Sequence, residues 1–150
     1  MKEIADQLQR LIDGYLPQLN AIAESNFNHK PRPEKWSKKE IIGHLIDSAH
    51  NNIRRFIVAQ YENNPTIVYR QDDWVKLNNY QDCDKNDIIS LWFLLNKQLC
   101  NILRSITDEN SKLTCRSEQE HTLRWLAEDY ITHLKHHIHT GLNLDPVAYP

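Results

Sequence analysis

Histidines are concentrated near the end of the sequence. Four of the eight histidines lie in the seven-residue stretch HLKHHIH, residues 133–139. His133 and His137 are four residues apart, so on an α-helix they project from nearly the same face, roughly 40° and one turn apart. Two imidazoles in this arrangement can bind one metal ion, as the paired histidines of zinc proteases do. Leu134 stands where those proteases carry a catalytic glutamate, so their mechanism is not expected here.

The other two histidines of this stretch point elsewhere. His136 lies about 60° from His133 on the flank away from His137, and His139 lies on a different face again. The pair His133 and His137 therefore leaves two interpretations open. It is one half of a metal site that needs a third ligand, or it belongs to a histidine-rich helix surface without a function.

A third ligand is available in His44, which lies in an apolar run of an expected helix. A buried imidazole needs partners for its ring nitrogens, and a metal ion is one such partner. Three imidazoles from two helices would leave an open coordination position, which is typical of catalytic metal sites. Such a set suits Zn, Ni, Fe or Co and disfavours Mg or Ca. The alternative is a core histidine whose nitrogens are satisfied by hydrogen bonds.

Two carboxylates lie close to these histidines in the helical pattern. Asp47 follows His44 by nearly one turn, and Asp129 precedes His133 by one turn. Either carboxylate could accept the second N–H of a ligating imidazole and fix its orientation.

We expect further side chains to line a pocket beside the metal, namely Asn51, Arg55 and Tyr130, with Trp74 as a lid residue. Arg55 could orient an anionic substrate, although an exposed helix arginine is the more common case.

The bulk properties bound the class of protein. A length of 150 residues suggests a single domain over residues 1–150. The apolar and charged fractions, 40% and 25%, are those of a soluble globular protein, and the net charge of −2 argues against nucleic acid or anionic membrane as partners. Three widely spaced cysteines, no signal peptide and no apolar run long enough to span a membrane predict a cytoplasmic protein with reduced thiols.

The apolar residues recur with helical period in four segments. We expect helices over residues 2–24 and 38–62, a third that begins at Asp84, and a fourth over 119–140. Only three glycines are present, which disfavours glycine-rich phosphate-binding loops and all-β folds. Ser37 and Glu40 have the spacing of a capping box at the start of the second helix.

These elements predict an all-α fold, a four-helix bundle with a long connection between the second and third helices. That connection, residues 63–83, contains Tyr69, Trp74 and Tyr80. Connections of this length usually cross a bundle or cover a pocket. A lid over the pocket and a crossover strap with aromatic anchors are the two alternatives.

Two stretches resemble the signatures of the DinB-like family (DinB/YfiT-like metalloenzymes). The first is WSKKEIIGHLIDSA, residues 36–49, with Asn51-Asn52 and Arg55-Phe56 beyond it. The second is WLAEDYITHLKHH, residues 125–137, and the short stretch QDDWV, residues 71–75, resembles a motif of the middle segment. The resemblance covers nearly the whole chain.

The resemblance implies a four-helix bundle with a long crossover and a metal held by three histidines, which match His44, His133 and His137. It also implies a homodimer, and a divalent ion that is zinc or nickel first, with iron, manganese or cobalt as alternatives. The function that it implies is that of a metal-dependent hydrolase or a transferase of low-molecular-weight thiols, acting on a small-molecule or thiol substrate. In either enzyme the ion would activate the nucleophile.

Two alternatives to an enzyme remain, because a fold does not decide a function. The first is a non-catalytic metal-binding or stress-response helical module. The second is a plain helical dimer whose histidines take up nickel only from a purification column.

Overall fold

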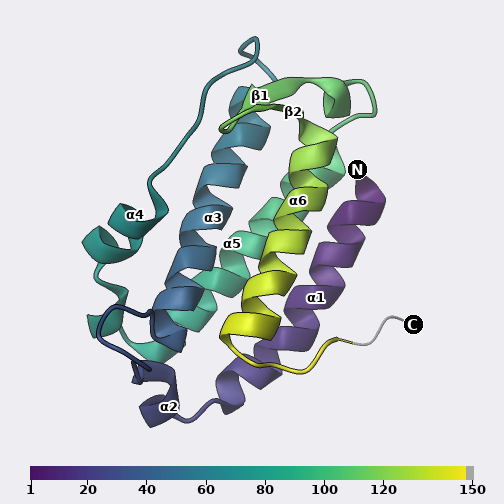
Figure 1. Cartoon of the computed structure of the whole chain (residues 1–150). Helices are drawn as coiled ribbons and strands as arrows, with labels where there is room; N and C mark the ends of the chain where they lie inside the picture. The colour runs from purple at the N-terminus through teal and green to yellow at the C-terminus, as the bar shows by residue number, and fades with distance from the viewer. Residues whose placement is uncertain (148–150) are drawn as a thin grey trace.

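Four long helices lie side by side and enclose the hydrophobic core (Figure 1). The computed structural model describes residues 1–147, and the long helices are α1 (Lys2–Ala21), α3 (Lys38–Val58), α5 (Lys85–Ser105) and α6 (Leu123–His136). Shorter elements connect or extend them: α2 (Glu24–Asn28), α4 (Gln71–Asn78), η1 (Tyr80–Asp82), η2 (Asn110–Lys112), β1 (Thr114–Arg116), β2 (Glu120–Thr122) and η3 (His137–Gly141). The predicted all-α four-helix bundle with a long crossover is confirmed.

The start of α3 follows directly from local sequence. Ser37 Oγ accepts a hydrogen bond from the Glu40 N–H at 3.1 Å, and Glu40 Oε2 accepts one from the Ser37 N–H at 2.8 Å. This is the predicted capping box, which satisfies two N–H groups that a helix end leaves free. Trp36 and Ile41 flank it and pack against the core. The capping box therefore fixes where α3 begins, two turns before His44.

The helix ends differ from the sequence-based expectation at several points. The first helix ends at Ala21 rather than at residue 24, because Ile22 is extended and the chain begins the separate helix α2 at Glu24. Helix α3 ends at Val58 rather than at 62, and the turn that follows reaches Asn64 in the left-handed region, with φ of 45°. The third long helix begins as predicted, with Asp84 accepting hydrogen bonds from two N–H groups of its first turn.

The expected start of the fourth helix at residue 119 is wrong. Residues 120–122 form β2, which pairs antiparallel with β1 so that His121 faces Cys115. Helix α6 begins only at Leu123, where Thr122 Oγ1 accepts a hydrogen bond from the Trp125 N–H at 3.2 Å. Past His136 the chain continues as a π-helical turn, η3, which ends at Gly141.

The long connection, which we call the strap and define as residues 63–83, is partly helical and packs along α3 (Figure 1). Tyr80 is buried, and its ring lies so close to α3 that a Cβ added to Gly43 would come within 2.1 Å of it. The Tyr80 hydroxyl also donates a hydrogen bond to Asp47 Oδ1 at 2.6 Å. Tyr80 therefore anchors the strap on α3, and it needs a glycine on the helix beneath it.

Within residues 1–147, no helix combines the length and the apolar character that a membrane span requires.

Candidate metal centre

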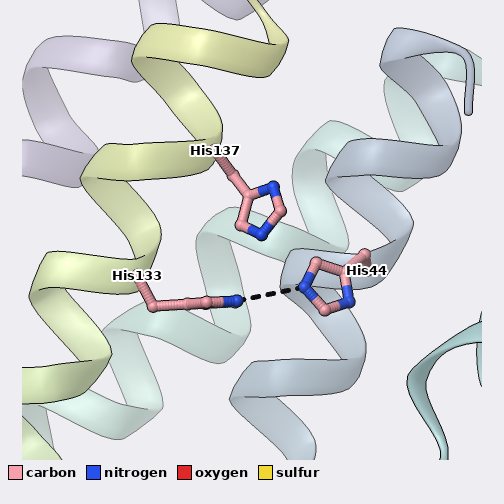
Figure 2. A group of neighbouring side chains, drawn as sticks. All are labelled: His44, His133 and His137. Carbon is pink, nitrogen blue, oxygen red and sulfur yellow. Dashed lines mark hydrogen bonds between the residues drawn. The ribbon is translucent and has the colours of Figure 1, made fainter.

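Three histidines, one from α3 and two from the continuous segment formed by α6 and η3, lie close together. His44 projects from α3, His133 from α6 and His137 from the first residue of η3, and their rings turn toward one another (Figure 2). Each ring offers a nitrogen, and these nitrogens all lie within 4.8 Å of one another. His44 Nε2 and His133 Nε2 are 3.1 Å apart.

This spacing suits a shared metal ion. Zinc–imidazole bonds are about 2.0–2.1 Å long, so the donor nitrogens around a tetrahedral ion are about 3.3–3.4 Å apart. The separation of His44 and His133 is close to that value, and small movements would bring in the His137 ring. The ring centroid of His137 lies 4.7 Å from that of His44 and 4.6 Å from that of His133. The residues present therefore fit a three-imidazole metal site.

Burial keeps these imidazoles neutral. Loss of solvent, together with repulsion from His133 and His137, lowers the pKa of His44 from 6.5 to about 3. Burial also lowers the pKa of His137 to about 4, and it lowers the pKa of His133. A neutral imidazole has a free lone pair, which is the form that binds a transition metal. At neutral pH the three donors therefore need not release a proton before a metal ion binds.

The turn that carries His137 is held on two sides. The hydroxyl of Tyr15, on α1, lies 2.6 Å from His139 Nε2. On the other side, Lys38 Nζ donates a hydrogen bond to the Leu142 carbonyl at 2.7 Å, and the Leu142 N–H returns one to the His137 carbonyl at 3.1 Å. Contacts to α1 and to the start of α3 thus fix the position of η3 relative to His44.

His137 borders an open cavity of about 620 Å³. Trp36, Ile41 and Gly141 contribute apolar walls, and the charged side chains that line the cavity are two cations and two carboxylates: Arg32, Lys35, Glu34 and Asp72. The Trp36 ring also packs against the His44 ring, with centroids 5.1 Å apart and an angle of 33° between the planes. Through His137, the histidine cluster therefore borders a cavity with a mixed apolar and charged lining.

A family model described as the DinB superfamily matches residues 7–140 of the chain. The chain belongs to the DinB superfamily. A relative from Oceanobacillus iheyensis, named "Putative metal-dependent hydrolase", is 28% identical over 92% of this chain and 79% of its own length. YfiT from Bacillus subtilis carries the same name and is 23% identical over 92% of this chain and 76% of its own length. The solved structure of YfiT shares the fold, with a TM-score of 0.81 and 24% identity over 92% of this chain and 82% of that one.

In this DinB-superfamily chain, Asp47 contacts the strap. Its Oδ1 accepts hydrogen bonds from Tyr80 and from Asn78 Nδ2, the latter at 3.0 Å. Asp47 Oδ2 and His44 Nδ1 are both buried without a hydrogen-bond partner among the described residues, and no hydrogen bond joins them. The carboxylate is buried, which raises the pKa of Asp47 to about 6. Its role beside a ligating His44 stays a prediction.

Asp129 is exposed on α6, and within residues 1–147 no hydrogen bond joins it to His133. It lines a different cavity, of about 470 Å³, together with Arg55. Its role in orienting His133 also stays a prediction.

The remaining predicted pocket residues each contact a different partner. Asn51 is buried, and its Nδ2 donates to the Asp47 carbonyl at 2.9 Å. The Tyr130 hydroxyl donates to Asn96 Oδ1 on α5 at 2.6 Å, so this side chain joins two helices inside the core. Trp74 is 36% exposed on α4, with its ring against Tyr69 at a centroid distance of 5.6 Å. Their roles in a pocket stay predictions.

The sequence did not reveal several contacts around the cluster. Trp36 has the local signature of a hydrophobic staple, and nothing in the linear pattern places its ring against His44. The partners Tyr15 and His139 are 124 residues apart, so no local pattern could pair them. Arg55 is only 9% exposed, which excludes the exposed helix arginine considered above.

Proposed function

We propose that the chain is a metal-dependent hydrolase in which His44, His133 and His137 hold one divalent ion. Zinc or nickel is the first choice for that ion, with iron, manganese or cobalt as alternatives. The observation that carries the proposal is the set of three neutral imidazole nitrogens within 4.8 Å of one another. The names of the relatives from Oceanobacillus iheyensis and Bacillus subtilis support the reaction class.

A divalent ion bound by three imidazoles supplies a Lewis acid and lowers the pKa of a water molecule toward neutrality. The residues of this chain have three tasks around it. The histidines hold the ion, and burial keeps their lone pairs free. Trp36 and Ile41 form an apolar wall beside His137, which reduces the water around a bound substrate. Arg32 and Lys35 line the same cavity and can attract a negatively charged part of a substrate, and the carboxylates of Glu34 and Asp72, which also line it, can attract a positively charged part.

Transfer of a low-molecular-weight thiol would use the same histidines with a thiol in the place of water. We rank hydrolysis first because the names of the relatives support it. A non-catalytic metal module would need a fourth protein ligand to close the site. His136 is the nearest further histidine in sequence, and its ring centroid lies 5.3 Å from that of His137.

The test begins with metal content. Protein without an affinity tag is purified without a metal column, and metal is measured by elemental analysis. About one ion per chain is expected in the wild type and in His50→Ala, a control on an exposed position of the same helix. Much less metal is expected in His44→Ala at unchanged circular-dichroism helicity. If neither purified nor zinc-, nickel-, iron- or manganese-treated wild type holds an ion tightly, the proposal fails.

The second half of the test is turnover. The metal-loaded wild type is screened with ester, amide and phosphoester substrates, and in parallel for transfer of small thiols to an electrophile. Hydrolysis that disappears in His44→Ala and remains in His50→Ala supports the proposal. Thiol transfer with the same dependence on His44 would assign the second reaction instead.

A further inference from the structure

Arg55 is a buried cation without an ion pair. Its side chain is only 9% exposed. Nε and Nη2 both donate to the Ile67 carbonyl, at 3.1 and 3.0 Å, and Nη1 donates to Asn52 Oδ1 at 3.4 Å. All of these acceptors are neutral, and in the part of the chain that the structure describes no carboxylate lies within 4.0 Å of the guanidinium. Buried arginines are ordinarily in direct contact with an anion, whereas the anions that act on Arg55, Glu118 and Asp129, do so from beyond that distance.

The guanidinium still has donors to offer. A guanidinium carries five N–H groups, and the three contacts of Arg55 use three of them. Two N–H groups therefore remain for a ligand. Arg55 borders two cavities, one of about 660 Å³ along the strap and one of about 470 Å³ toward α6. A carboxylate that entered either cavity would find the planar pair of donors that it binds best.

The cavity toward α6 also holds negative charge. Glu118 and Asp129 line it, and both are exposed side chains without an ion pair among the described residues. A simple anion would be attracted by Arg55 and repelled by these two carboxylates. A simple cation would be attracted by the carboxylates and repelled by Arg55. A molecule with both charges satisfies both groups. The stacked rings of His121 and Trp125, 3.6 Å apart, give the same cavity an aromatic wall.

The cavity toward α6 is lined by residues of α3 and α6, the helices that carry His44 and His133. Arg55 follows His44 by eleven residues on α3, which returns it to within roughly 20° of the same face about 16 Å further along. Asp129 precedes His133 by one turn on α6. The larger Arg55 cavity and the cavity at His137 also share Asp72 as a lining residue. A long molecule could therefore be held at Arg55 while another part of it lies near the histidines.

We propose that the cavity of about 470 Å³ toward α6 binds a zwitterionic, amino-acid-like or peptide-like molecule. Its carboxylate contacts Arg55, and its ammonium group faces Glu118 and Asp129. The inference deepens the proposed hydrolase function by naming a substrate class, and it rests on that function only for the claim that the bound molecule is hydrolysed. Binding itself needs no metal, so it can be tested on its own.

The test uses the full chain after dialysis against a chelator, so that no ion can bind the probe. Triglycine is titrated in, and binding is followed by NMR on the indole N–H resonance of Trp125. A saturable shift is expected. Triglycinamide, which lacks the carboxylate, and N-acetyltriglycine, which lacks the ammonium group, should each bind about tenfold more weakly. Absence of saturable binding, or equal binding of the three probes, would overturn the inference.

Variants test which residues contact the carboxylate and the ammonium group of triglycine. Arg55→Lys loses the planar donor pair and should weaken triglycine at least about tenfold, whereas Arg70→Gln, at an exposed cation of the larger cavity, should not. Arg55→Lys also disturbs the bond to Ile67, so Glu118→Gln, at an exposed side chain, provides a second test that leaves the fold alone. It should weaken triglycine but not N-acetyltriglycine. If Glu118→Gln has no effect, or if Arg70→Gln weakens binding as much as Arg55→Lys, the assignment is wrong.

Because binding and turnover are measured separately, the two proposals can fail independently. Triglycine binding without metal uptake would retain the Arg55 site and remove the hydrolase. Metal-dependent hydrolysis without triglycine binding would retain the hydrolase and remove the Arg55 site.

Discussion

At the scale of single residues, the imidazoles of His44, His133 and His137 were predictable because each side chain obeys helical spacing. His133 and His137 are four residues apart and therefore share one helix face, and His44 lies in an apolar run that indicates a position near the core. The spacing alone left a histidine-rich surface as the alternative for the pair. The neighbours of these rings were less predictable. Trp36 precedes α3, and its ring direction depends on how the loop before the helix folds back.

Asp47 gives a pH dependence that can be measured. Burial raises its pKa from 3.8 to about 6, so between these pH values the folded chain keeps a proton that the unfolded chain has lost. The contribution of Asp47 to the free energy of unfolding is therefore fully present below about pH 4 and falls by about 3 kcal/mol as pH rises through 6. Urea unfolding of the wild type and of Asp47→Asn between pH 4 and 8 measures this difference.

The comparison of these two proteins isolates Asp47 from the histidines. A histidine whose pKa is lowered by folding contributes in the opposite sense, because its stabilisation is lost as pH falls below about 6.5. Both proteins keep those histidines, so their contribution cancels in the difference. A difference that stays constant from pH 4 to 8 would contradict the raised pKa of Asp47.

At the scale of elements, local sequence predicted where some helices begin, and contacts between distant segments changed where others begin. The capping box at Ser37 and the cap at Asp84 were visible in the sequence, because capping needs only residues within one turn. The start of α6 moved to Leu123 because residues 120–122 pair with β1. The strap was expected as a loop, and the helix α4 within it packs on α3, which sequence periodicity over eight residues could not establish.

Gly43 is the point where two elements touch most closely. Alanine at a helix interior is ordinarily more stabilising than glycine by about 1 kcal/mol. Here the added Cβ would come within 2.1 Å of the Tyr80 ring, so Gly43→Ala should instead destabilise the protein by about 1–3 kcal/mol. Denaturant unfolding gives the sign directly.

A double-mutant cycle provides the control for Gly43. With Tyr80→Ala already present, the ring is gone, and adding Gly43→Ala should stabilise the helix rather than weaken it. Destabilisation of similar size in both backgrounds would show that the Tyr80 contact is not the cause.

At the scale of the whole molecule, the bundle brings together ligands from its second and fourth long helices, and an ion bound between them would cross-link the fold. An ion that binds only the folded chain stabilises it by about 4 kcal/mol at a thousand times its dissociation constant. For a chain of 150 residues this raises Tm by roughly 10 °C. Calorimetry with and without zinc should show this rise in the wild type, and in His137→Ala the rise should be absent. An equal rise in both proteins would locate the zinc elsewhere.

The separation of the ligands along the chain also has a consequence during synthesis. His44 is made 93 residues before His137. At about 5–20 residues per second, the ribosome needs about 5–20 s to cover that distance. Throughout this interval His44 has been made and its partner His137 has not, so the complete trio cannot capture an ion from the cell until the last helix has emerged. An ion that needs all three histidines would therefore be taken up after translation, from the metal supply that the folded bundle meets.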